Sequence, residues 1–284
     1  MKANLVTTKF PRYALTLIII CLPGLIISAQ TKADDKVKNK DFCSNNYSVS
    51  DKISYKETRE IILPASNLVN VDGQRNGGIR VKGETRSDVL VRACVQTVGL
   101  TDEEARAAAK NIQIETGSII RAEGAGGETN WAVSYEILVP RLSNLKLSTH
   151  NGGIGISSVE GTVEFEAING GVSLSNLAGD VKGKTRNGGV SVELSGNAWR
   201  GNGLDVETTN GGVKLSMPEN YAARVETGTV NGGFKSEIIQ LNVERNEKTR
   251  GVRINTALNG GGAPIRVVTT NGGIKISSSS TRTL

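Results

Sequence analysis

Residues 145–175 read LKLSTHNGGIGISSVEGTVEFEAINGGVSLS and hold two copies of the tripeptide Asn-Gly-Gly, 18 residues apart. Copies of the tripeptide that we interpret as corners begin at Asn76, Asn151, Asn169, Asn187, Asn210, Asn231 and Asn271. In most copies, apolar residues stand three and five places after the Asn and six places before it. An apolar residue at every second position predicts strands with one buried face, and Asn-Gly favours the positive φ of a sharp corner. Each repeat is therefore expected to be a strand, a corner and a second strand.

Two architectures fit this pattern, because a coil of a β-solenoid and a meander of hairpins put the same residues on one face. The corners from Asn151 to Asn187 keep a step of 18 residues. A period of about 20 residues favours the solenoid, in which equivalent residues of successive coils stack in ladders. The predicted fold class is all-β, a β-solenoid-like stack of two-strand repeats, and the closed meander is the alternative. Longer steps later in the chain predict insertions around Trp199 and between residues 236 and 259.

The first 29 residues have the features of a secretory signal peptide. Basic residues precede an apolar run at residues 14–27, which is followed by Ser28 and Ala29. An uncleaved signal anchor is the alternative, although the run is short for a membrane span. We therefore expect an exported protein of the periplasm, cell envelope or extracellular space, with no membrane span in the mature chain.

The rest of the chain is expected to form one continuous β region with short flanking segments. The predicted parts are a signal peptide at 1–29, a flexible N-terminal arm at 30–56, an N-terminal β section at 57–141, an Asn-Gly-Gly repeat section at 142–278 and a polar tail at 279–284. Thr101 and Glu104 have capping-box spacing ahead of an Ala-rich segment. They predict one short helix near residues 102–110, which would cap one end of the sheets.

The charge pattern argues against a nucleic-acid partner. The formal net charge of +6 falls to +3 once the three basic residues of the leader are removed. Lysine and arginine alternate with acids along the predicted strands instead of forming one basic stripe. We therefore interpret the charges as solvated strand faces.

Cys43 and Cys94 are the two cysteines that follow the leader. In an oxidising compartment, such an isolated pair predicts a disulfide, and two unpaired thiols are the alternative. Closing a loop of about 50 residues would stabilise the fold by roughly 3 to 4 kcal/mol in the loop-entropy model. The bridge would tie the N-terminal arm to the strand that contains Cys94.

Several motifs carry a family resemblance across nearly all of the mature chain. They are Cys43, Leu63-Pro64-Ala65, Arg75-Asn76-Gly77-Gly78-Ile79, the acidic Ala-rich helix, Val139-Pro140, Thr149-His150-Asn151-Gly152-Gly153, Thr208-Thr209-Asn210-Gly211-Gly212, Glu226-Thr227-Gly228-Thr229-Val230-Asn231-Gly232-Gly233 and Val267-Val268-Thr269-Thr270-Asn271-Gly272-Gly273. This order resembles the bacterial Asn-Gly-Gly β-strand-repeat family labelled "putative adhesin", a domain of unknown function. That family is similar to auto-transporter adhesin heads and to the toastrack domains of envelope-stress proteins. The resemblance implies an exported β-solenoid-like fold and supplies no catalytic residues.

The residues themselves indicate no enzyme. His150 is the one histidine, and the chain has no Gly-x-Ser-x-Gly elbow for a hydrolase triad. No His/Cys cluster has zinc spacing, and Ser157 stands where a calcium-binding nonapeptide repeat needs aspartate. The aromatic residues do not recur in phase, as a sugar-stacking track would require. We therefore expect no catalytic, cofactor or metal site.

The function predicted from the sequence is that of an exported structural or interaction protein, an adhesin-like β-repeat module of the cell envelope or surface. The alternative is a toastrack-like envelope-stress or assembly component in the periplasm. A carbohydrate-active β-helix enzyme is a less favoured third hypothesis. The expected partner is a protein or another envelope component, and the sequence leaves its identity and the oligomeric state open.

Overall fold

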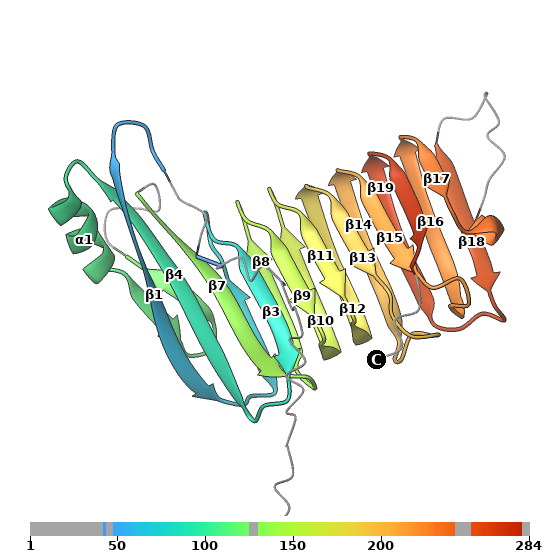
Figure 1. Ribbon diagram of the computed structural model, residues 1–284, viewed down its shortest axis with the longest axis horizontal. Helices are drawn as coiled ribbons and strands as arrows, with labels where there is room; N and C mark the ends of the chain where they lie inside the picture. The colour runs from blue at the N-terminus through green and yellow to red at the C-terminus, as the bar shows by residue number, and fades with distance from the viewer. Residues whose placement is uncertain (1–41, 44–47, 125–129, 242–250, 280–284) are drawn as a thin grey trace, which may run out of the picture. The chain divides into compact units, whose positions relative to one another are not determined.

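The computed structural model describes residues 42–43, 48–124, 130–241 and 251–279 (Figure 1). The chain divides into two units, residues 1–39 and Lys40–Leu284, and every described residue belongs to the second. The predicted signal peptide, much of the predicted arm and all of the predicted tail except Ser279 lie outside the described residues. Within the described part, no helix is long and apolar enough to span a membrane.

Two ten-stranded sheets make up the described fold. The first sheet runs, in spatial order, β1 (Ile53–Pro64), β4 (Asp88–Gly99), β7 (Trp131–Pro140), β3 (Ile79–Glu84), β9 (Ile154–Ser157), β11 (Val172–Ser175), β13 (Val190–Glu193), β15 (Val213–Met217), β20 (Ile274–Ser278) and β17 (Phe234–Ser236). The second sheet runs β18 (Val252–Leu258), β16 (Ala223–Asn231), β19 (Pro264–Asn271), β14 (Gly203–Asn210), β12 (Ala178–Asn187), β10 (Glu160–Ala167), β8 (Asn144–Thr149), β2 (Leu68–Asp72), β6 (Ile120–Glu123) and β5 (Gln113–Thr116). The helices are α1 (Asp102–Lys110) and the short 3-10 helix η1 (Ile239–Leu241).

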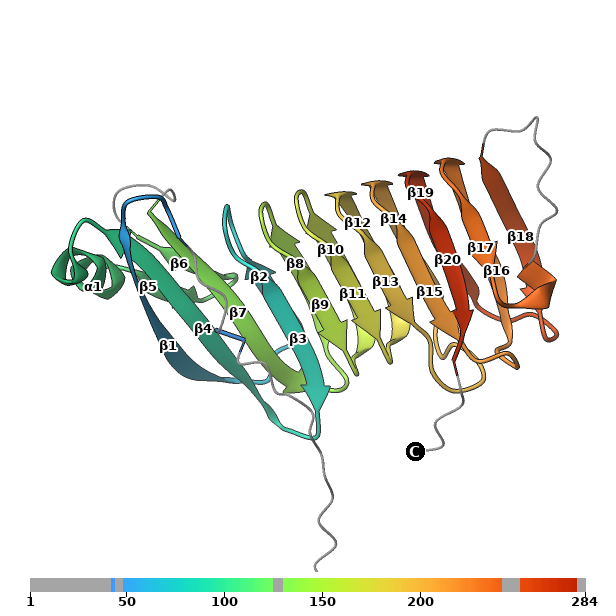
Figure 2. The same ribbon diagram turned by 45° about the horizontal axis from the view of Figure 1, so that its top comes forward.

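Each repeat forms one coil with a strand in each sheet, as Figure 2 shows for the middle of the stack. The chain leaves a second-sheet strand such as β8, turns at the Asn-Gly-Gly corner and enters a first-sheet strand such as β9. Neighbouring coils pair in parallel, with residues 18 apart in register, as in Val163 with Val181 and Val172 with Val190. The β-solenoid-like stack predicted from the period is therefore confirmed.

The apolar phase of the repeat builds the core between the two sheets. Six equivalent second-sheet residues form one buried row: Leu145, Val163, Val181, Leu204, Ile265 and Val225. The residues three places after the corner Asn form a matching row from the first sheet, which includes Ile154, Val172 and Val190. Because each buried aliphatic side chain contributes about 1.5 to 3 kcal/mol, adding one coil to another is strongly favourable.

The coils do not stack in the order of the sequence. Strand β19 lies between β14 and β16, and β20 lies between β15 and β17. The coil that contains Asn271 is therefore interior, and the coil that contains Asn231 is outermost. Position in the sequence therefore does not fix the pairing order of the coils, and Gly272 belongs to an interior coil.

The prediction that the Asn-Gly-Gly corners have positive φ is wrong. Neither the Asn nor the Gly residues of these corners have positive φ. Positive φ occurs instead at the opposite corner, at Ser158 (58°), Asn176 (50°) and Gly179 (101°). The glycines of the Asn-Gly-Gly corner are needed for a different reason, the close approach of one coil to the next.

The helix predicted near residues 102–110 is confirmed at Asp102–Lys110, at the β1 end of the fold. Glu104 N–H donates to Thr101 Oγ1 (3.2 Å), and Leu100 N–H donates to Glu104 Oε2 (2.8 Å). At the other end, the Arg59 guanidinium of β1 donates to the carbonyls of Ala109 (2.7 Å) and Ile112. A cation at the carbonyl end of a helix is favourable, so β1 holds the helix in place.

Candidate functional site

The Asn-Gly-Gly corners form an unbroken ladder along the stack. Each asparagine amide donates from Nδ2 to the Oδ1 of the asparagine in the preceding coil, at 2.8 to 3.1 Å. In spatial order the ladder is Asn76, Asn151, Asn169, Asn187, Asn210, Asn271 and Asn231. These side chains are occupied with one another and set the register of the coils.

A buried threonine two places before the asparagine reinforces most corners. Thr185 Oγ1 donates to Gly170 O (2.8 Å), and Thr208 Oγ1 donates to Gly188 O (2.7 Å). Each accepting glycine belongs to the preceding coil, and a Cβ on it would overlap backbone atoms of the coil before that. The motif Thr-x-Asn-Gly-Gly is therefore a coil-to-coil contact, with a satisfied hydroxyl and a glycine that permits close approach.

The outer face of the second sheet carries an alternating row of charges. In register across six strands, this row is Lys146, Glu164, Lys182, Asp205, Arg266 and Glu226. Arg266 Nη1 lies 2.6 Å from Asp205 Oδ1, and Arg266 Nε lies 3.8 Å from Glu226 Oε1. Opposite charges directly across neighbouring strands are favourable, so this face is electrostatically self-complementary. It is not a strongly basic or acidic surface.

The outer face of the first sheet is different. The residue four places after each corner asparagine points outward, and in spatial order this row is Arg80, Gly155, Ser173, Ser191, Lys214, Lys275 and Lys235. Three lysines on β15, β20 and β17 are thus direct neighbours. Lys275 lies 3.8 Å from Glu237, whereas Lys214 and Lys235 form no ion pair with any described residue. We call Lys214, Lys275 and Lys235 the lysine row.

The lysine row corrects the interpretation that the charges avoid any single stripe. The signal was present in the sequence as Asn-Gly-Gly-Val-Lys at 210, Asn-Gly-Gly-Phe-Lys at 231 and Asn-Gly-Gly-Ile-Lys at 271. Counting charges along the chain hides it, because acids occur in the second-sheet strands that precede β15 and β17, namely β14 and β16. Aligning the repeats on their asparagines and comparing one phase at a time would have found it.

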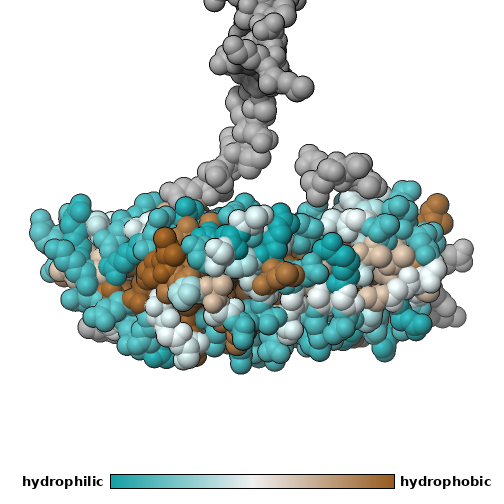
Figure 3. Space-filling view, turned by 90° about the horizontal axis from the view of Figure 1, so that it is seen from below, coloured by the Kyte–Doolittle hydropathy of each residue, from teal (hydrophilic) through white to brown (hydrophobic). Residues whose placement is uncertain are grey.

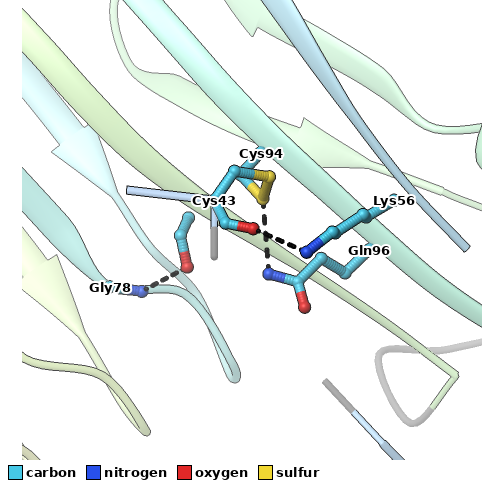
Figure 4. The surroundings of a disulfide bond; sticks show 6 residues. Cys43, Lys56, Gly78, Cys94 and Gln96 are labelled. Carbon is cyan, nitrogen blue, oxygen red and sulfur yellow. Dashed lines mark hydrogen bonds between the residues drawn. A yellow bond between two sulfur atoms is a disulfide. The ribbon is translucent and has the colours of Figure 1, made fainter. Parts of the chain in front are cut away.

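The structure joins Cys43 to Cys94 in a disulfide, with Cα atoms 5.4 Å apart (Figure 4). Cys94 takes an outward position on β4, next to the inward Ala93 and Val95, and is fully buried. Lys56 Nζ donates to Cys43 O (3.2 Å), and Gln96 Nε2 lies 3.3 Å from Cys94 Sγ. The bridge therefore fixes Phe42 and Cys43 over strands β4 and β7, beside a shallow groove that reaches Arg80 and Gly155.

His150 lies at the first full corner of the repeat region and is exposed. Its backbone N–H donates to Gln74 O (2.8 Å), and among the described residues its imidazole makes no hydrogen bond. The neighbouring Ser148 hydroxyl donates to Asp72 Oδ1 (3.1 Å) and not to the histidine. This geometry does not assemble a nucleophile with its base. No group of three or more His, Cys, Asp or Glu residues in the described ranges could hold a metal ion.

Two buried tyrosines have raised pKa values but do not belong to a cluster of catalytic side chains. Burial raises the pKa of Tyr221 to about 12, and burial together with the Asp72 carboxylate raises the pKa of Tyr135. Both side chains lie in the core that joins the two sheets. They are packing residues, and their protonation bears on stability.

Apolar side chains are exposed at the ends of some strands. Figure 3 shows apolar surface gathered on part of the underside of the molecule. The largest exposed fractions near the ends of β1, β2 and β7 belong to Ile62 (69%), Leu68 (48%) and Leu142 (76%). Ile62 is in register with Leu90, which is in turn in register with Leu138. Nothing in the structure indicates what would cover these residues.

Comparison with solved structures returned several remote matches. A "putative cell adhesion protein" from Clostridium sporogenes ATCC 15579 is 13% identical, with 78% of this chain and 100% of that chain covered and a TM-score of 0.44. A "putative adhesin" from Bacteroides fragilis NCTC 9343 is 12% identical, with coverages of 79% and 97% and a TM-score of 0.31. A "Putative lipid binding protein" from Parabacteroides distasonis ATCC 8503 is 11% identical, with coverages of 79% and 97% and a TM-score of 0.29. No curated protein matches the chain.

The comparison with family models is more informative. The model described as Toastrack DUF4097 matches residues 34–277, which include all but two of the described residues. The match spans Cys43 and Cys94, the helix and the seven corners of the asparagine ladder, and so covers the residues that carry the resemblance drawn from the motifs. The chain therefore belongs to the Toastrack DUF4097 family.

Proposed function

We propose that the protein is an exported, non-enzymatic scaffold of the cell envelope or surface, whose repeated strands present an outer sheet face to a binding partner. The observation that carries this proposal is the continuous ladder of seven corner asparagines, each hydrogen-bonded to the next. A ladder of this kind fixes the register of every coil. The outward residues are then held at regular intervals, as a presenting surface requires.

The disulfide supports export. Cys43 and Cys94 are bridged across a sequence separation of 51 residues, and such bonds persist in oxidising compartments. A bridge of this length stabilises the fold by about 4 kcal/mol in the loop-entropy model. A reduced protein would lose the attachment of its arm to β4.

The lack of enzymatic activity is part of the proposal. Its support is the outward chemistry of the repeats, in which acids pair with neighbouring cations, as Glu226 does with Arg253 (2.9 Å). The groove beside His150 also holds Ser148 and Asp72, but the Ser148 hydroxyl donates to Asp72 and not to His150. We expect His150→Ala to leave binding and any measured turnover unchanged. Loss of a hydrolytic activity in that variant would contradict the proposal.

Cell fractionation tests the proposed location. A tagged full-length protein should appear in the periplasm, outer envelope or medium with a Cys43–Cys94 bridge that resists thiol labelling. Removing residues 1–29 should retain the protein in the cytosol with two reactive thiols. A full-length protein that stays in the cytosol with free thiols would refute the proposal.

Membership of the Toastrack family favours a second candidate, a periplasmic component of envelope stress or assembly. Protease treatment of intact cells separates the two. A surface module should be degraded from outside, whereas a periplasmic component should be degraded only after the outer barrier has been opened. A periplasmic marker protein serves as the control for barrier integrity.

A further inference from the structure

The lysine row places three like charges side by side, and contacts within the fold offset this only in part. On the second sheet, cross-strand neighbours alternate in sign from Lys146 to Glu226. On the first sheet, Lys214, Lys275 and Lys235 are placed side by side on three adjacent strands. Like charges directly opposite one another are destabilising, so the fold tolerates a repulsion here that it avoids on its other face.

Protection against edge-to-edge aggregation accounts for only part of the row. Lys235 lies on β17, the edge strand of the first sheet, where a lysine discourages pairing with another chain. Lys214 and Lys275 lie on interior strands, whose backbone groups are already paired on both sides. Lys275 has only a long contact with Glu237 (3.8 Å), and Lys214 forms no ion pair with a described residue, so edge protection does not explain these two lysines.

The surroundings of the row leave space for an extended ligand. Each lysine follows a Gly-Gly pair and one inward residue, and the next outward residues on β15 and β20 are Ser216 and Ser277. Toward the other end of the sheet the same row continues through Ser191, Ser173 and Gly155 to Arg80. The serine and glycine side chains are small, so a linear molecule could lie across these strands without meeting bulky groups, while Glu237 borders the row at its β17 end.

We infer that the lysine row binds a linear acidic polysaccharide that lies across the strands of the first sheet, with successive carboxylates opposite successive lysines. Neighbouring strands are about 4.8 Å apart, so the three lysines span about 10 Å. A chain of uronic acid sugars carries one carboxylate per ring at a comparable step. This inference rests on the proposed export of the protein, which would expose it to envelope polysaccharides.

Two other polyanions fit the row less well. Single-stranded nucleic acids are usually held by aromatic side chains that stack on the bases, and the outward row from Arg80 to Lys235 has none. Surface binding to anionic lipid usually combines cations with apolar side chains that insert, and the outward neighbours of Lys214 and Lys275 are serines. A polymer of sugars needs only charge pairing and hydroxyl contacts.

The test uses the full mature chain and oligogalacturonate of three and six sugars, measured by calorimetry at low ionic strength. The triple variant Lys214→Gln, Lys275→Gln, Lys235→Gln should lose about tenfold in affinity, since exposed ion pairs contribute modestly and three are removed. A matched control replaces Lys146, Lys182 and Lys184 of the second sheet by Gln and changes the net charge by the same amount. The control should keep its affinity within about twofold.

Binding measurements with other ligands identify the class of ligand. Neutral dextran, single-stranded DNA and vesicles with anionic lipid headgroups should each bind more weakly than the hexasaccharide. Equal loss in the two triple variants, tighter binding of DNA or vesicles, or no binding of either oligogalacturonate would overturn the inference. A first-sheet variant that self-associates with unchanged affinity for the oligosaccharide would instead show that the lysines only protect the sheet.

Folding and location are checked separately from binding. The first-sheet variant should melt at the wild-type temperature or above it, because its substitutions remove repulsion between like charges. If cells export the protein but the purified chain does not bind the acidic oligosaccharide, this inference fails and the proposed scaffold role stands. If the protein is never exported, the scaffold proposal fails before the binding result is considered.

Discussion

Replacing Gly170 by alanine should weaken the stack strongly, whereas the same change at Gly171 should not. Neither residue has positive φ, so alanine is not excluded by backbone angle at either place. A Cβ on Gly170 would overlap the carbonyl of Gly152 in the preceding coil and would lie 2.9 Å from Gly153 N. A Cβ on Gly171 would meet Gly189 O at 3.4 Å, an ordinary contact.

The magnitude follows from which atoms would have to move. Inserting a methyl group into a packed region costs about 1 to 3 kcal/mol. The atoms that Gly170→Ala would meet belong to backbone that is held by the asparagine ladder, so they cannot rotate aside. We therefore expect a loss of about 3 kcal/mol for Gly170→Ala, which would lower Tm by roughly 6 to 12 °C in a domain of this size. Gly171→Ala should change the free energy of unfolding by about 0.5 kcal/mol or less.

Urea denaturation followed by circular dichroism measures both variants against wild type. The slope of the free energy against urea should be unchanged, because both variants unfold the same surface. Hydrogen exchange should show increased opening in the coils on either side of Gly170. Equal losses for the two variants would refute the argument, since they would mean that the corner requires glycine flexibility and not close approach.

Three further predictions test other parts of the fold. Gly272→Ala should cost about as much as Gly170→Ala because its coil is interior, whereas Gly232→Ala, in the outermost coil, should cost roughly half as much in urea melts; equal losses would contradict the pairing order. Cys94→Ser should lower stability by about 3 to 4 kcal/mol and make the protein insensitive to dithiothreitol, and a variant that still responds to reductant would contradict the bridge. Raising the pH from about 10 to about 12 should destabilise the wild type, because burial raises the pKa of Tyr221 and the unfolded chain loses its phenolic protons first. Tyr221→Phe should make unfolding free energy depend less steeply on pH over that interval, and an unchanged slope would be inconsistent with a buried neutral phenol.

The strand-corner-strand repeat could be predicted from the sequence because its pattern depends on residues close together in the chain. The apolar residues three and five places after most of the asparagines lie in the core, as for Ile154 and Ile156, and the corners from Asn151 to Asn187 stack at the predicted step. The helix was also readable, since Thr101 and Glu104 mark its start and act within four residues of each other. Features that depend only on neighbouring residues were predicted well.

Features that depend on which coil touches which could not be read in the same way. The glycines of the corner were attributed to positive φ, although Gly170 is required by the carbonyl of Gly152 in another coil. The insertion of β19 between β14 and β16 could not be predicted from the sequence, because the three strands share the same alternation of apolar residues. The lysine row was missed for a related reason, since Lys275 comes between Lys214 and Lys235 only after that coil is inserted.

Electrostatics on the second sheet explains why the last coil inserts where it does. Arg266 of β19 stands between Asp205 of β14 and Glu226 of β16, so the insertion separates two acids and completes the alternation of sign. The same step has the opposite effect on the first sheet, where it extends a pair of lysines to a row of three. Lys275 has Glu237 at 3.8 Å and lies directly opposite both Lys214 and Lys235. One long contact with an acid does not offset two neighbours of like charge, and the anionic ligand inferred above would do so.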